Sequence, residues 1–119
     1  MGEARMSRAL YAAYLTGTAG QTIALLYIGD GILAGVDVGT MKYEGAYTKN
    51  LDGSLDGAIE YTVPAGSPLI TGGTPATSPT RISLPLKLPA GFDDGRVITI
   101  NTPLGPVNAR FEKVKDIPE

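Results

Sequence analysis

The sequence predicts an all-β protein, a small antiparallel β-barrel of about eight strands. Three observations carry this prediction. Alternation of apolar and polar residues is the dominant pattern, and no segment shows the helical period over 11 or more residues. Turn signals separate the alternating segments. Gly35, Gly45 and Gly57 fall inside predicted strands, where glycine marks a bulge or a barrel bend. A two-sheet sandwich is the structural alternative.

Length and composition predict one domain spanning residues 1–119. Hydrophobic residues make up 43% of the chain, charged residues 18%, and the formal net charge is −2. This balance is typical of a globular chain, because a disordered chain combines low apolar content with high net charge. The charged segment 1–7 precedes the first predicted strand, and we expect it to be a disordered leader.

The predicted strands follow one another with short turns between most of them, as in an up-and-down barrel. They are 8–16, 22–28, 32–38, 41–47, 55–63, 80–88, 96–101 and 107–112. Segment 80–88 shows the alternation most clearly, because Ile82, Leu84 and Leu86 face one side and Arg81 faces the other. Pro85 has no backbone N–H, so this strand is predicted to lie at an edge or to carry a bulge.

The second predicted strand is apolar on both faces, since no polar residue occurs between Ile23 and Ile28. Such a strand is typically covered on both sides, here by a partner subunit or by the terminal segment. Ile23, Leu25, Leu26 and Ile28 are therefore our candidates for a partner or dimer interface. The turn that follows contains Asp30-Gly31, a dipeptide that favours a tight hairpin.

One long segment, 64–80, interrupts the regular spacing of strands. It is rich in Pro, Gly, Ser and Thr, and residues 69–71 suggest a short strand within it. Two interpretations are open: a mobile surface loop, or a lid or partner-docking loop at the mouth of the barrel.

The missing residue types exclude many chemistries. With no Cys and no His, the chain cannot form the usual zinc sites, Cys-ligated Fe–S clusters, His- or Cys-ligated haem, or Ser-His-Asp triads. No second titratable group is paired with a candidate acid or base, so we predict no enzyme, no metal and no cofactor.

The basic residues are scattered along the chain, which argues against nucleic-acid binding. Without a signal peptide or a long apolar span, we expect a cytoplasmic protein that is not bound to a membrane.

The tyrosines are the candidates for a ligand site, because each combines apolar area with one hydroxyl. The set that we expect to line a cavity is Tyr14, Tyr27, Tyr43, Tyr47 and Tyr61. The alternative is that these rings fill the barrel core or its rim, since an eight-stranded barrel is only just wide enough for one small ligand. Asp37 is an acid in an apolar strand, on the same side as Leu33, and we expect it to accept structural hydrogen bonds.

Residues Gly20–Tyr47 show a distinctive order: an apolar strand, a short turn, then Gly35-x-Asp37 and Tyr43-x-Gly45-x-Tyr47. This stretch resembles the negative regulators of bacterial type III secretion, the family of the repressor of the LEE-operon global regulator. The resemblance implies a lipocalin-like eight-stranded barrel that forms a homodimer. It also implies a non-enzymatic role, in which the protein binds a transcriptional activator and holds it inactive. The turn at 49–53 lacks that family's acidic surface tetrad.

Two function hypotheses therefore stand side by side. The first is a regulator that binds a partner protein through a dimeric barrel with an exposed apolar patch and a filled or nearly filled interior. The second is a carrier or sensor of a small apolar ligand held in a cavity of a few hundred cubic ångströms, with segment 64–80 over the mouth. The packing of the barrel interior discriminates between them.

Overall fold

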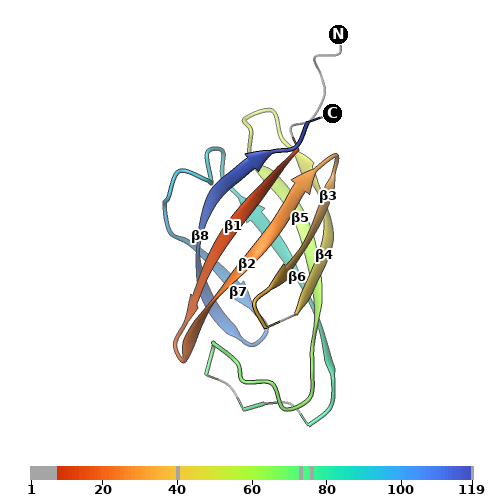
Figure 1. Cartoon of the computed structure of the whole chain (residues 1–119), viewed down its shortest axis with the longest axis vertical. Helices are drawn as coiled ribbons and strands as arrows, with labels where there is room; N and C mark the ends of the chain where they lie inside the picture. The colour runs from red at the N-terminus through yellow and green to blue at the C-terminus, as the bar shows by residue number, and fades with distance from the viewer. Residues whose placement is uncertain (1–7, 40, 73, 76, 119) are drawn as a thin grey trace.

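Eight strands and no helix make up the computed structural model, which describes residues 8–39, 41–72, 74–75 and 77–118 (Figure 1). The predicted leader, 1–7, lies outside the described residues. The strands are β1 (Ala9–Gly17), β2 (Gly20–Gly29), β3 (Ile32–Asp37), β4 (Lys42–Lys49), β5 (Leu55–Val63), β6 (Thr80–Leu88), β7 (Ile98–Thr102) and β8 (Gly105–Asp116).

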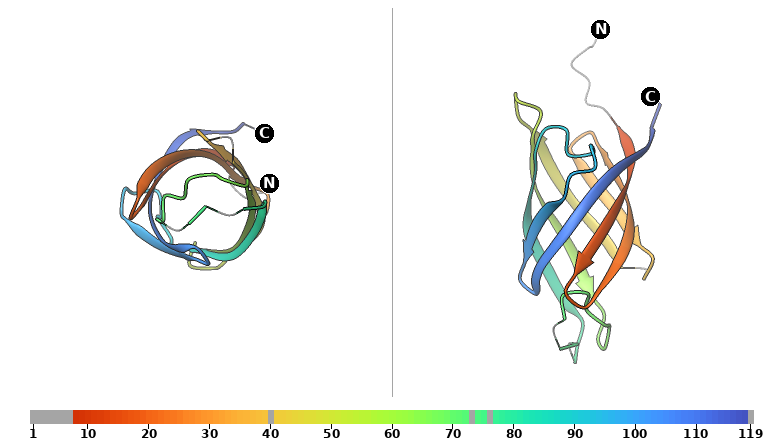
Figure 2. Two further views of the ribbon diagram at one scale, coloured as in Figure 1. Left: turned by 90° about the horizontal axis from the view of Figure 1, so that it is seen from below. Right: turned by 90° about the vertical axis from the view of Figure 1, so that its left-hand side faces the viewer.

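All eight strands belong to one antiparallel sheet with the order β6-β5-β4-β3-β2-β1-β8-β7. The first strand pairs with the last, Ala13 opposite Phe111, so the sheet curls into a nearly closed ring (Figure 2). The prediction of an all-β barrel is confirmed, and the sandwich alternative is wrong. The two ends of the sheet are β6 and β7, so Pro85 lies in an end strand, as its missing N–H predicted.

Most strand boundaries differ from the prediction by one or two residues, and two of the differences have clear local reasons. β7 begins at Ile98 rather than at 96, because the Arg96 backbone N–H donates to the Asp94 carboxylate at 3.0 Å within the preceding turn. β8 runs on to Asp116, beyond the predicted end at 112, because it continues to pair with the start of β1 after a register shift between Leu10 and Tyr11. Alternation loses its phase at such a bulge, so the sequence pattern ended there.

The glycines inside strands lie where neighbouring backbones approach most closely. A Cβ atom on Gly45 would lie 2.0 Å from the carbonyl oxygen of Ala58, and one on Gly57 would lie 2.4 Å from that of Ala46. A Cβ atom on Gly35 would lie 2.3 Å from the carbonyl oxygen of Leu25. The absence of a side chain therefore lets these strands coil tightly around the barrel.

The barrel interior is filled with side chains at the end near the chain termini. Phe92, from the connection between β6 and β7, packs between Tyr11 and Phe111, with ring centroids 5.2 and 5.4 Å apart. Leu33 and Leu88 are fully buried in the same cluster. This end forms the main core and leaves the opposite end of the barrel for the site described next.

Candidate functional site

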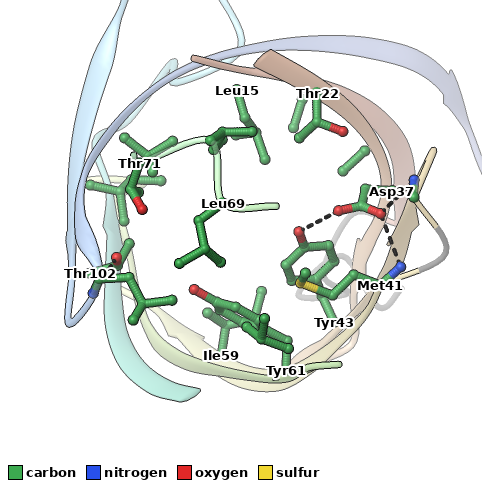
Figure 3. A pocket seen from close by; sticks show the side chains of 18 of the residues that line it. Leu15, Thr22, Asp37, Met41, Tyr43, Ile59, Tyr61, Leu69, Thr71 and Thr102 are labelled. Carbon is green, nitrogen blue, oxygen red and sulfur yellow. Dashed lines mark hydrogen bonds between the residues drawn. The ribbon is translucent and has the colours of Figure 1, made fainter. Parts of the chain in front are cut away.

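A cavity of about 400 Å³ occupies the half of the barrel away from the termini (Figure 3). Apolar side chains from almost every strand form most of its wall. They include Leu15, Leu26, Ile59, Leu84, Leu86 and Ile100. Volumes of roughly 300–1,000 Å³ are typical of small-molecule sites in proteins. The interior is therefore not completely filled, and the cavity is large enough for a small ligand.

Asp37, at the end of β3, brings a carboxylate to this apolar wall. Its Oδ2 accepts a hydrogen bond from the Tyr43 hydroxyl at 2.8 Å, and its Oδ1 accepts from the backbone N–H groups of Gly39 and Met41 at 2.9 and 3.0 Å. The carboxylate thus ties β3 to the start of β4. It has the role expected from its place in the sequence, an acceptor of structural hydrogen bonds.

Two tyrosines, Tyr43 and Tyr61, lie side by side on the cavity wall with ring centroids 5.1 Å apart. Burial raises the pKa of Tyr43 far above its ordinary value, and the hydrogen bond to Asp37 raises it further. Burial also raises the pKa of Tyr61. Both phenols therefore stay protonated at neutral pH and give the wall neutral hydroxyl groups.

The segment between β5 and β6 crosses the mouth of the barrel (Figure 2). It is fastened on the far side, where the Ile70 carbonyl accepts a hydrogen bond from Ala19 N–H at 2.7 Å and the Thr71 carbonyl accepts from the Thr18 hydroxyl at 2.6 Å. Leu69 points inward over the cavity (Figure 3). Of the two interpretations of this segment, these contacts favour a lid.

The predicted short strand at 69–71 is wrong. Leu69 and Ile70 lie in or beside a turn, and Gly72 follows with a φ of +89°, a left-handed conformation suited to glycine. The backbone of Ile70 bonds to the β1–β2 turn through its carbonyl and does not form a ladder with a neighbouring strand. Local β-propensity was therefore overridden by docking onto another part of the chain.

Thr71 contributes an unusual polar group to the cavity wall. Its hydroxyl oxygen is buried and, within the described residues, has no hydrogen-bond partner. A buried hydroxyl without a partner is destabilising by roughly 1–3 kcal/mol. Such a group is rare in native proteins and indicates a place where a bound molecule or a water would supply the partner.

The structure divides the five predicted cavity tyrosines into three groups. Tyr43 and Tyr61 line the cavity. Tyr47 is buried but belongs to the filled end of the barrel. The predictions for Tyr14 and Tyr27 are wrong, because both side chains lie on the outer surface of the sheet. Tyr14 packs there under the Arg110 guanidinium, 5.3 Å from the ring centroid.

The physical reason for these errors is the phase of the alternation. In β2 the inward positions carry Ala24 and Leu26, and Tyr27 has the opposite parity. The same rule identifies Thr22, a cavity-lining residue that the sequence analysis missed although it shares the parity of Ala24. Thr71 and Thr102 were also missed. No signal in the sequence could have found Thr71, since it reaches the cavity from a segment without regular structure.

The four candidate interface residues also lie on two different faces. Ile23 and Leu25 are 46% and 45% exposed on the outside of the barrel, whereas Leu26 and Ile28 are 6% and 4% exposed and point into the core. In the single chain the outer face of this strand is exposed, so its cover by a partner subunit or by the terminal segment stays a prediction. Leu26 and Ile28 are therefore core residues, and only Ile23 and Leu25 remain available to a partner.

No protein-family model matches the chain, and neither a curated protein nor a solved structure matches it. The resemblance to regulators of type III secretion therefore stays a prediction of the sequence. In the part of the chain that the structure describes, no helix is long and apolar enough to cross a membrane. The same residues contain no group of three or more acidic side chains placed to hold a metal ion.

Proposed function

We propose that this barrel is a carrier or sensor that binds a small, mainly apolar molecule in the cavity beneath the 64–79 segment. The cavity itself is the observation that supports this proposal most directly. Its volume of about 400 Å³ and its apolar wall resemble those of ligand sites. A well-packed protein of this size leaves few voids larger than a water molecule, so an unfilled interior of this volume calls for an occupant.

Binding without catalysis is the chemistry that the wall supports. Asp37 already accepts hydrogen bonds from Tyr43, Gly39 and Met41. The raised pKa values of Tyr43 and Tyr61 keep both phenols protonated at neutral pH, so neither is available as a general base. An acid–base mechanism needs a second group that exchanges protons in this range, and the described lining supplies none.

Titration with N-phenylnaphthylamine, a neutral apolar dye that fluoresces on entering an apolar site, tests the proposal. The chain has no Trp to complicate the signal. We expect saturable binding of one dye per chain. Ala24→Phe places a ring in the cavity and we expect it to abolish binding, whereas Ala12→Phe, on the outward face of neighbouring β1, leaves binding unchanged. Equal binding by both variants, or no saturable binding by the native chain, would refute the proposal.

A second candidate function is that of a protein-binding regulator, and it rests on the outer face of β2 and β3. Ile23 and Leu25 are exposed there, Leu25 pairs with Val36 across the strands, and Val38 beside them is 77% exposed. A contiguous apolar patch of this kind often marks a protein-binding surface. It would serve the homodimer, or the protein partner, that the resemblance implies.

Light scattering coupled to size-exclusion chromatography tests this second candidate. We expect the native chain to elute as a dimer and the Leu25→Lys variant as a monomer. Val114→Lys changes an exposed apolar residue on β8 and serves as the control. A native chain that is monomeric at high concentration would refute the dimer.

A further inference from the structure

We infer that the cavity selects its ligand by charge: it takes an apolar molecule whose polar end is neutral or cationic, and it rejects carboxylates such as fatty acids. This inference rests on the proposed function and specifies the chemical class of its ligand. It follows from the distribution of charge around the cavity. Among the described lining residues Asp37 is charged, and neither Lys nor Arg is present. The remaining polar side chains there are hydroxyls and one amide.

Within the described residues, the Asp37 carboxylate keeps one place for a further donor. A carboxylate offers about four acceptor sites, two on each oxygen. Gly39 and Met41 N–H groups occupy Oδ1, while the Tyr43 hydroxyl occupies one site on Oδ2. An amine or hydroxyl of a ligand can therefore donate to Oδ2 without displacing the existing hydrogen bonds. Figure 3 shows this carboxylate on the cavity wall beside the Tyr43 hydroxyl.

An anionic ligand, in contrast, would bind unfavourably in this cavity. Its carboxylate would leave water for an apolar cavity that provides no cationic partner, and burial of an unpaired charge is strongly unfavourable. It would also be repelled by Asp37 at short range in a medium of low dielectric constant. The basic side chains closest in sequence to the cavity wall, Lys42, Lys87 and Arg110, are exposed on the outside of the barrel. They cannot neutralise a charge inside it.

Thr71 supplies a second polar contact on the opposite wall. In Figure 3, Thr71 and Asp37 lie on opposite sides of the cavity with the apolar side chains between them. The Thr71 hydroxyl has no protein partner within the described residues and can both donate and accept. A hydrocarbon body with a neutral or cationic donor at one end, such as an alcohol or an amine, therefore satisfies the Asp37 wall, and a second polar group at its far end would satisfy Thr71.

Competition within one matched series tests the charge selectivity. Decanol, decylamine and decanoate share an unbranched ten-carbon skeleton and differ at the head group. Decanol is used below its solubility limit, and decylamine and decanoate below their micelle concentrations, to displace N-phenylnaphthylamine from the full chain. We expect decanol and decylamine to compete, and decanoate to compete at least about tenfold more weakly than decanol.

Asp37→Asn removes the charge and keeps an oxygen that accepts from Gly39 and Met41. We expect this variant to bind decylamine less tightly, and decanoate more tightly, than the native chain does. Glu44→Gln, which removes an exposed carboxylate from the outside of β4, is the control and keeps the native order.

The outcomes separate the two proposals. If the dye binds and decanoate competes as well as decanol does, the charge selectivity is refuted and the cavity still binds ligands. If the dye does not bind, the proposed function fails, and the charge selectivity fails with it. The native chain alone decides the decanol and decanoate comparison, so the test stands even if Asp37→Asn does not fold.

Discussion

Gly17→Ala is the perturbation that tests whether the 64–79 segment closes the cavity. A Cβ atom at Gly17 would lie 2.3 Å from the carbonyl oxygen of Ile70 and 2.7 Å from its carbonyl carbon. Both neighbours are backbone atoms, so no side-chain rotation relieves the clash. Since ordinary contact begins at 3.4 Å, the segment must move away by about 1 Å, that is 3.4 − 2.3 = 1.1 Å.

This displacement loosens the two hydrogen bonds that fasten the segment, from Ala19 N–H to Ile70 and from the Thr18 hydroxyl to Thr71. Each such bond is worth about 0.5–1.5 kcal/mol, so the closed position loses about 1–3 kcal/mol. If the segment must open before a ligand leaves, the dissociation rate rises roughly 5- to 150-fold. The free energy of global unfolding falls by no more than this amount, because the segment lies outside the main core and the rest of the barrel keeps its contacts.

Stopped-flow fluorescence measures this rate when the bound dye is displaced by excess decanol. Gly20→Ala is the matched control. Gly20 pairs with Gly17 in the same hairpin, but its added Cβ would meet Ile70 at an ordinary contact distance of 3.6 Å. We expect the control to dissociate at the native rate. If Gly17→Ala also dissociates at the native rate, the segment is not a lid.

Three further predictions concern stability and pH. Leu33→Ala removes a buried side chain from the filled end and lowers the free energy of unfolding by roughly 2–5 kcal/mol, whereas the exposed Val38→Ala changes it by less than about 0.5 kcal/mol in urea titration. Thr71→Val removes a buried hydroxyl that has no partner in the described residues, so the ligand-free protein gains about 1 kcal/mol in the same assay; a loss of stability would show that the hydroxyl is satisfied. Burial and Asp37 raise the pKa of Tyr43, so the unfolded chain releases this proton first as the pH rises. The stabilising contribution of the protonated Tyr43 side chain is complete below pH 10.0, the ordinary pKa of tyrosine, and declines as the pH rises above it. An ultraviolet titration of the folded protein in which every tyrosine ionises near pH 10.0 would contradict this prediction.

Much of the fold could be predicted because alternation is a local signal. Ile82, Leu84 and Leu86 alternate with polar neighbours, and β6 has its predicted bounds, Thr80–Leu88. The inward position of Asp37 followed from the same rule, since it shares the parity of Leu33. Pro85 marked an end strand because a missing N–H limits where a strand can lie.

The cavity could not be predicted, because alternation says which residues point inward and not how much of the interior they fill. Phe92 fills one end from a connecting segment, and no periodic pattern includes it. Thr71 reaches the other end because Ile70 docks on a turn about fifty residues earlier, at Ala19. Both placements depend on contacts between parts of the chain that are distant in sequence.

Isoleucine methyl spectra, recorded by NMR with and without saturating dye, test most directly whether the cavity is the binding site. The isoleucines sample each environment: Ile59 and Ile100 line the cavity, Ile28 lies in the filled end, and Ile23 lies on the outer face. We predict that the methyl signals of Ile59 and Ile100 shift while those of Ile28 and Ile23 do not. Shifts confined to Ile23, or no shift at saturating dye, would contradict a ligand inside the barrel.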